Sequence, residues 1–348
     1  MKIQPGKLKE IVISILKGWN ASDEEAVLMA ENLVQADMRG IDSHGVAYLK
    51  PLADRINAGM INIPTPIEIV KEDHAISILD GGNGLGQVAA HRAMKMSIER
   101  ARNYGVGLTL VRNTNNIGSL AFYTLMAAKE GMAGMVMCNA APSMSPWGGA
   151  EAFLGTNPLS IGLPNGSGGP VVLDMSSSVV ARGKIRRAQR MKERIPLGWA
   201  LNQSGVPTTD PGAALKGTLS PIGGPKGYGL ALMIDVLAGL LSGSQYGPEV
   251  KTFHQPLGPT GIGVFSLVID IERFMPLNQF KRLLEFYGES IKRSKKAKDV
   301  SRIYLPGEIE LEKEEESRTK GIELDSTVIE SLNQLLENTK SPLRLGGE

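Results

Sequence analysis

The spacing of apolar residues predicts helices and strands along most of the chain. Residues 6–20 and 22–36 carry apolar side chains at helical spacing, and Ser22 stands where a capping residue would begin the second helix. Two β-rich segments, residues 67–70 and 75–79, are expected to form strands. The N-terminal part is therefore predicted to form paired helices followed by a pair of strands.

The middle and end of the chain continue this alternation. Helices are expected at residues 86–104, 120–130, 179–194, 227–239, 277–294 and 327–336, the last capped by Ser326. Strands are expected at residues 106–111, 133–138, 171–173 and 262–269. Continuously apolar strands between helices suit a sheet buried on both faces, which indicates an α/β fold.

Size and charge restrict the class of protein. The 348 residues suggest two domains. With 38 basic and 36 acidic residues, the net charge of +2 gives no global attraction to nucleic acid or anionic membranes. Cys138 is the only cysteine, and the N-terminal segment has no signal-peptide pattern. We therefore expect a cytoplasmic protein without a nucleic-acid or membrane partner.

A glycine-rich loop at residues 80–86 (DGGNGLG) follows an expected strand and precedes a helix. Its spacing is not GxGxxG, because Gln87 occupies the position of the last glycine. The acidic residue that a Rossmann fingerprint places about 20 residues later is also missing. The loop is predicted to be a simple turn rather than a classical dinucleotide-binding loop.

His44 lies in a polar cluster, Asp42-Ser43-His44-Gly45, just past the end of a helix. The Ser43 hydroxyl and the Asp42 carboxylate could orient an imidazole or a substrate, although a lone histidine more often has a structural role. Both interpretations stand from the residues alone. The other histidines are scattered without metal-ligand spacing, so no metal site is expected.

Two helix starts are candidate anion sites. Asp174 and Ser176–Ser178 follow a buried strand, where they serve either as caps or as part of a site for a cofactor phosphate. Lys226, flanked by Pro225 and glycine, offers the same choice between an anion contact and ordinary loop chemistry. The basic segment 182–194 lacks the aromatic residues typical of nucleic-acid binding.

Several motifs together, in order and spacing, resemble the malate/L-lactate dehydrogenase family of the non-Rossmann type. This family also includes ureidoglycolate dehydrogenase, sulfolactate dehydrogenase, 2,3-diketogulonate reductase and the cyclic ketimine reductases. The motifs are residues 42–45 (DSHG), 155–158 (GTNP), 173–176 (LDMS) with 180–184 (VARGK), 195–199 (IPLGW), 205–211 (GVPTTDP) and 226–229 (KGYG).

The resemblance implies a non-Rossmann α/β fold, which explains the missing glycine fingerprint. It implies a central cofactor domain at residues 76–259 and a second domain built from both chain ends, residues 1–75 with 260–348. It also implies NAD or NADP as cofactor and a homodimer with active sites near the partner subunit.

The resemblance further implies site residues. Asn139 and Pro142 would lie beside the nicotinamide, and Tyr48 and Thr156 near the substrate. The other implied cofactor contacts are Asp174, Met175, Ser176, Ser178, Lys184, Pro225, Lys226, Pro306, Gly307 and Glu308. Two positions depart from the family: Asn116 replaces a histidine often assigned as the acid/base, and Tyr48 replaces an arginine that grips the substrate carboxylate.

These features predict an NAD(P)H-dependent oxidoreductase that reduces a small 2-oxo acid to the 2-hydroxy acid. Asn116 cannot exchange a proton, and the resemblance makes His44 the remaining histidine of the site. We therefore expect His44 to donate the proton, while Ser43 and Asn116 hydrogen-bond the substrate. Lys184 or Lys226 would bind anionic groups. The alternatives are a reductase of cyclic ketimines or sugar-derived keto acids, and a cofactor-binding family member with impaired catalysis.

Overall fold

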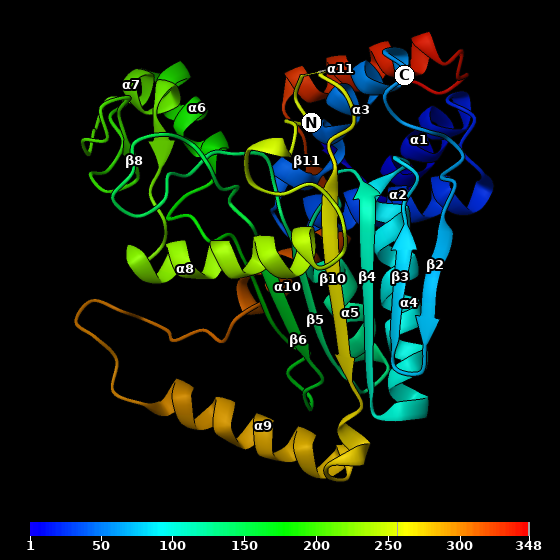
Figure 1. Cartoon of the computed structure of the whole chain (residues 1–348), viewed down its shortest axis with the longest axis vertical. Helices are drawn as coiled ribbons and strands as arrows, with labels where there is room; N and C mark the ends of the chain where they lie inside the picture. The colour runs from blue at the N-terminus through cyan, green and yellow to red at the C-terminus, as the bar shows by residue number, and fades with distance from the viewer. Residues whose placement is uncertain (256, 347–348) are drawn as a thin grey trace.

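A seven-stranded mixed sheet forms the centre of the computed structural model, which describes residues 1–255 and 257–346 (Figure 1). Its strand order is β2-β3-β4-β10-β5-β6-β7. The strands are β2 (Glu68–Asp73), β3 (Ile76–Asp80), β4 (Val106–Thr114), β5 (Ala133–Cys138), β6 (Leu159–Leu163), β7 (Val171–Met175) and β10 (Ile262–Ile269). Only β3 and β4 pair in parallel; the other neighbours are antiparallel.

β10 lies in the middle of this sheet, between β4 and β5. Val264 and Val268 are fully buried on one face, where α4 (Gly86–Tyr104) and α5 (Ala121–Lys129) cover the sheet (Figure 1). The domain division expected from the sequence, with a boundary at residue 260, would place this strand in the domain built from the chain ends. Its pairing partners are more than 120 residues away in the sequence, and local patterning does not reveal such partners.

The opposite face of the sheet is apolar but only partly covered. α8 (Pro225–Ile234) continues as a π-helical segment (Asp235–Leu240), whose Ala238 packs beside Leu110 and Phe265. Other apolar side chains on this face remain half-buried: Ile78, Leu108, Met135, Met137 and Leu267. The sheet is therefore buried fully on one face, where burial on both was expected.

Both chain ends contribute to a second hydrophobic core. It contains α1 (Pro5–Gly18), α2 (Asp23–Met38), α3 (Leu49–Asn57) and α11 (Ser326–Asn338). β1 (Lys2–Ile3) pairs with β11 (Ile322–Glu323), which brings the ends of the chain together. Ser22 caps α2 as predicted, in a reciprocal pair with Glu25. The cap of α11 is Asp325 rather than Ser326, because Asp325 accepts the Val328 N–H at 2.9 Å.

A small lobe with its own core projects from one side of the sheet (Figure 1). It contains α6 (Arg182–Met191), α7 (Pro211–Lys216) and the strand pair β8 (Ala200–Leu201) and β9 (Thr218–Leu219). α6 is shorter than the predicted helix 179–194, since Lys192 adopts a left-handed conformation with φ of 56° and ends it.

Two helices complete the fold. α9 (Leu277–Arg293) lies at the far end of the sheet from α1 and α11, and a long connection leads from it to α10 (Glu308–Lys320) (Figure 1). α10 was not predicted, because its glutamate-rich sequence has no buried residue and so no apolar periodicity. No helix within the described residues combines the length and apolarity needed to cross a membrane.

Candidate functional site

His44 sits on a 3-10 turn, Asp42–His44, that directly follows α2. Its ring is half-buried, and its Nδ1 atom lies 2.9 Å from the Ser43 Oγ atom. Burial lowers the pKa of His44, which favours the neutral imidazole. The contact with Ser43 fixes the ring through Nδ1 and leaves Nε2 as the nitrogen for a substrate.

Asn116 belongs to a tightly folded loop before α5. Its Oδ1 atom accepts the Gly118 N–H at 2.9 Å, and Gly118 adopts φ of 72°. Gly86, at the start of α4, permits this loop to approach, because a Cβ there would lie 2.3 Å from the Asn116 carbonyl oxygen. The side-chain oxygen of Asn116 thus holds the loop, and its amide N–H groups remain as donors.

Asp174 connects this loop to the end of β7. Its carboxylate accepts the Ala121 N–H at 2.8 Å and the Ser119 hydroxyl at 3.1 Å, so it caps α5 from another element. Desolvation raises the pKa of Asp174, although these hydrogen bonds and the charge of Arg39 oppose the rise. Asp174 therefore caps α5, and not the helix that follows it in the sequence, which was the cap expected from the local pattern.

A cavity of about 410 Å³, here called the Asp174 cavity, is lined in part by Asp174 itself. Three residues of the predicted cofactor site line it: Asp174, Pro306 and Gly307. Arg39 and Ile41, just before the His44 turn, line it as well. The Pro306 carbonyl accepts the Val172 N–H at 3.0 Å, so the loop before α10 lies along the edge of β7.

Arg39 gives the Asp174 cavity a positive group. It is 4% exposed and pairs with Glu314 of α10 at 2.9 Å. Its Nε atom is buried without a hydrogen-bond partner among the described residues. Sequence reasoning missed Arg39, although a basic residue within an apolar helix end was a usable signal.

The serines after β7 form a local network with Thr156. Ser177 donates both its N–H and its hydroxyl to the Thr156 carbonyl, each at 2.8 Å. Ser176 and Ser178 lie 3.1 Å apart through their Oγ atoms, and Ser178 donates to the Val180 carbonyl. The predicted cofactor segment 174–178 and the predicted substrate residue Thr156 are therefore neighbours.

Asn139 has no free side-chain atom for hydrogen bonding to a nicotinamide. It is fully buried; its Nδ2 atom donates to Asp235 and to the Gln245 carbonyl, and its Oδ1 accepts the Gly263 N–H. Pro142, three residues later, is half-buried. Asn139 ties the end of β5 to β10 and to the π-helical segment Asp235–Leu240, so only its backbone is available to a ligand.

Tyr48 is 8% exposed and stacks on Phe253, with ring centroids 4.7 Å apart. Arg55 lies over the same Phe253 ring and donates to the carbonyls of Gln255 and Gly258. Burial raises the pKa of Tyr48, which keeps the phenol neutral. Tyr48 and the unpredicted Arg55 thus anchor the loop that follows the 3-10 turn Gly247–Glu249.

Lys184 and Lys226 are exposed, on α6 and at the start of α8. Pro225 is exposed too and occupies the first turn of α8. Met175 is half-buried at the end of β7. No hydrogen bond of the described residues links either lysine to the His44 turn.

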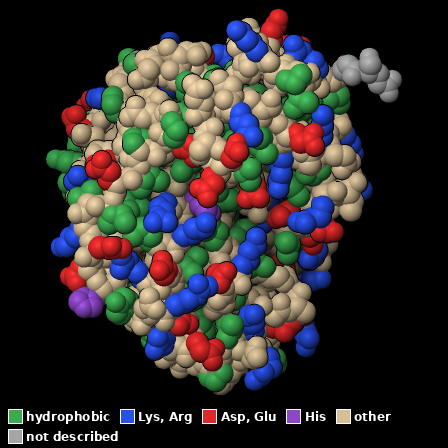
Figure 2. All heavy atoms as spheres, turned by 90° about the vertical axis from the view of Figure 1, so that its right-hand side faces the viewer, with side chains coloured by type: hydrophobic (Ala, Val, Ile, Leu, Met, Phe, Trp, Pro, Cys, Tyr) green, Lys and Arg blue, Asp and Glu red, His purple; other side chains and the backbone are tan. Residues whose placement is uncertain are grey.

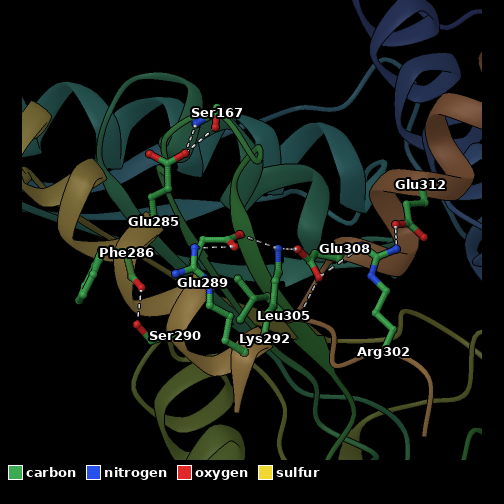
Figure 3. A network of polar contacts seen from close by, with 11 residues as sticks. Ser167, Glu285, Phe286, Glu289, Ser290, Lys292, Arg302, Leu305, Glu308 and Glu312 are labelled. Carbon is green, nitrogen blue, oxygen red and sulfur yellow. Dashed lines mark hydrogen bonds and ion pairs between the residues drawn. The ribbon is translucent and has the colours of Figure 1, made fainter. Parts of the chain in front are cut away.

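Glu308 begins α10 and joins it to α9 (Figure 3). It pairs with Lys292 and accepts the Leu305 N–H at 2.9 Å. Desolvation raises its pKa, but the hydrogen bond from Lys292 and the other contacts outweigh it and lower the pKa overall. Glu285 of α9 accepts hydrogen bonds from Ser167, beyond β6, so α9 is attached at two places (Figure 3).

The charged residues that the structure describes form no metal-binding group, and one face of the molecule carries both basic and acidic side chains. In the part of the chain that the structure describes, no group of three or more histidine, cysteine or acidic residues could hold a metal ion. Figure 2 shows basic and acidic side chains interspersed over the face beside α4 and β2. This face does not resemble a nucleic-acid-binding surface.

Comparisons with known proteins give consistent matches. Residues 3–333 match the family model described as malate/L-lactate dehydrogenase. Malate dehydrogenase from Pyrococcus abyssi is 40% identical over 344 residues, which cover 96% of this chain and 94% of that protein. Ureidoglycolate dehydrogenase from Escherichia coli is 33% identical, covering 97% of each chain. The structure of sulfolactate dehydrogenase from Methanocaldococcus jannaschii superposes with a TM-score of 0.93, 37% identity and 98% coverage of both chains.

Proposed function

Because this chain belongs to the malate/L-lactate dehydrogenase family, we propose that it interconverts a small 2-oxo acid and its 2-hydroxy acid with a nicotinamide cofactor. It is an oxidoreductase that acts on CH–OH groups, as its relatives are. The observation that carries the proposal is made at the Asp174 cavity: Ile41, just before the His44 turn, lines it, and Ser119, just after the Asn116 loop, donates a hydrogen bond to Asp174.

The Asp174 cavity fits part of a dinucleotide. Gly307 has φ of 89° and lies against the Val172 backbone, where a Cβ would come within 3.0 Å of the carbonyl oxygen, so glycine lets this loop lie against β7 and form a wall of the cavity. The carboxylate of Asp174, which lines the cavity, is suited to accept hydrogen bonds from ribose hydroxyls. A bound reduced nicotinamide supplies the hydride. NAD and NADP both remain candidates.

His44 moves the proton in this proposal. When the carbonyl is reduced, negative charge develops on its oxygen, and protonated Nε2 of His44 donates to it. When the hydroxy acid is oxidised, the neutral ring accepts the hydroxyl proton, a direction that the lowered pKa of His44 favours. In this proposal the Asn116 amide N–H groups hydrogen-bond the substrate, because an amide cannot exchange a proton near neutral pH and its oxygen is already bonded to the Gly118 N–H.

The substrate is proposed at the level of its class. The relatives are named for malate, ureidoglycolate and sulfolactate, which are all 2-hydroxy acids with a second polar or charged group. Tyr48 stacks on Phe253 and offers no cation, so the substrate carboxylate must find its positive partner elsewhere. Lys184 and Lys226 are the candidates, as exposed cations on the small lobe and on α8.

A homodimer is also part of the proposal. α9 exposes Leu283, Phe286 and Tyr287, which are spaced to lie on one side of the helix. The adjacent sheet face keeps apolar side chains half-buried. Surfaces of this kind are typical of subunit contacts, and a second copy of the chain is the occupant proposed here.

The test is a cofactor-oxidation screen with NADH and NADPH against pyruvate, oxaloacetate, sulfopyruvate, diketogulonate and cyclic ketimines. The expected result is turnover of at least one 2-oxo acid, with kcat reduced about 100-fold or more in the His44→Ala variant. Equal turnover by wild type and His44→Ala would contradict the role of His44. Tight cofactor binding without turnover of any substrate would instead favour a catalytically impaired family member.

A further inference from the structure

Asp37 is a buried carboxylic acid in the last turn of α2, seven residues before His44. It is 8% exposed, and no ion pair joins it to a cation within residues 1–255 or 257–346. It also faces the negative end of the helix dipole. Burial of such a group costs free energy unless its hydrogen bonds compensate, so its presence points to a specific role.

The carboxylate of Asp37 fills the inside of the His44 turn. Its Oδ2 atom accepts the Val46 N–H at 2.8 Å. Its Oδ1 atom lies so close to Gly45 that a Cβ at this glycine would be 1.7 Å away. Asp37 therefore touches both residues that follow His44, and Gly45 is required because only glycine leaves room for the carboxylate.

The other end of the turn is fixed by backbone hydrogen bonds. The Ile41 N–H donates to the Ala36 carbonyl at 2.8 Å, and the His44 N–H donates to the Ile41 carbonyl at 2.9 Å. Asp37 fixes the C-terminal side of the turn through its hydrogen bond with the Val46 N–H. The segment that carries His44 is thus held on both sides by the last turn of α2.

We propose that Asp37 is a positioning residue for His44, whose carboxylate sets the backbone path at Gly45 and Val46 and thereby the direction of the imidazole. This rests on the proposed function, in which His44 moves the proton. Asp37 does not touch the reacting atoms; it acts through the turn.

The charges around Asp37 define how it responds to pH. Burial raises the pKa of Asp37 to about 7; the Val46 N–H opposes the rise, and Asp42 on the turn adds to it. Arg39, on the same helix, is paired with Glu314 of α10. The ionised carboxylate accepts a stronger hydrogen bond from the Val46 N–H, so the turn is held more firmly once Asp37 has lost its proton.

The experiment compares Asp37→Ala and Asp37→Asn with Glu31→Gln, an exposed site on the same helix, as a matched control. Asparagine keeps an acceptor for Val46 but carries no charge. The measurements are kcat and KM across the neutral pH range, hydrogen exchange of the Val46 amide, and NMR titration of the His44 ring.

Asp37→Ala is expected to lower kcat about tenfold or more, because small displacements of a reacting group cost rate, with KM changed less than kcat. Exchange at Val46 becomes faster and the His44 ring titration shifts. Asp37→Asn is expected to keep the protection of Val46 and most of kcat, and to lose the contribution to the pH profile near pH 7. Glu31→Gln behaves as wild type.

The proposal is overturned if Asp37→Ala leaves both the Val46 exchange and the His44 titration unchanged. These two readouts do not depend on turnover. If His44→Ala retains full activity while Asp37→Ala shifts both readouts, the proposed catalytic role fails and the positioning role stands. A folded Asp37→Asn variant without Val46 protection also overturns it.

Discussion

The carboxylate of Asp174, at the end of β7, accepts a 2.8 Å hydrogen bond from the backbone N–H of Ala121 at the start of α5. Both residues of this bond line the Asp174 cavity, together with Pro306 and Gly307. One side chain therefore couples the stability of α5 to the shape of the Asp174 cavity.

Replacing Asp174 with alanine is expected to destabilise the protein by about 1–2 kcal/mol, because α5 loses its cap. Urea unfolding of the variant measures this loss. The same variant should bind NADH or NADPH more weakly, as followed by cofactor fluorescence. Ser119→Ala is the matched control, since it removes one donor to Asp174 and leaves the cap in place. Unchanged stability would contradict the capping role.

Asp37→Asn is expected to flatten the dependence of stability on pH. The folded pKa is about 7 against 3.8 for the free side chain, so between these values the unfolded chain releases the proton and the folded chain keeps it. Asp37 therefore makes unfolding progressively easier as pH rises from about 4 to 7, by a total on the order of 4 kcal/mol. Denaturant midpoints at several pH values measure the slope, with Glu31→Gln as control; equal slopes in both variants would refute the expectation.

Glu308→Gln is expected to loosen the junction between α9 and α10 (Figure 3). Because the pKa of Glu308 is lowered in the folded state, its contribution is present at neutral pH and is lost as pH falls through the folded pKa. Both partners are partly exposed, so the loss at neutral pH should be about 1 kcal/mol or less.

The comparison for Glu308→Gln is Glu312→Gln, which breaks the more exposed pair with Arg302. The expected order is a larger effect for Glu308→Gln at neutral pH and no difference from wild type in acid. Hydrogen exchange in α10 localises the loosening. A larger effect from Glu312→Gln would mean that the more exposed Arg302–Glu312 pair, and not the Lys292–Glu308 pair, holds this junction.

Phe286→Glu is expected to convert a dimer into a monomer, because Phe286 is 72% exposed at the centre of the apolar face of α9. Light scattering after size exclusion should give twice the 37.3 kDa chain mass for wild type and one chain mass for the variant. Arg293→Glu, on an exposed polar position of the same helix, should remain a dimer. A monomeric wild type would exclude the proposed homodimer.

Local sequence patterns determined most of the helices and strands. Residues 86–104, 133–138 and 262–269 were predicted at the bounds that the structure shows, since their periodicity or apolar run has a clear beginning and end. The capping box at Ser22 was equally local. The motifs in sequence order also sufficed to indicate the family, which the comparisons confirm.

Tertiary structure decided what each polar residue does. Asn139 and Tyr48 were predicted beside the cofactor and substrate, but their side chains are engaged with Asp235, Gly263 and Phe253, partners far away in sequence. Asp37, Arg39 and Arg55 carried no motif, and their importance follows from burial and from contacts that form only on folding.

The position of β10 and the shape of the site are both determined by contacts that form only when the chain folds. Sequence fixes short-range conformation through periodicity, capping and turn chemistry, which act over a few residues. Which strands pair depends on segments far apart in the sequence, since β10 and β4 are separated by more than 100 residues. Which polar atoms find partners also depends on the folded path of the chain, even over the 53 residues between Ala121 and Asp174 or the 9 between Asp37 and Val46. That is why the family and most helices and strands could be predicted from the sequence. The hydrogen bond of Asp37 to the His44 turn and the cap of Asp174 on α5 could be seen only in the folded structure.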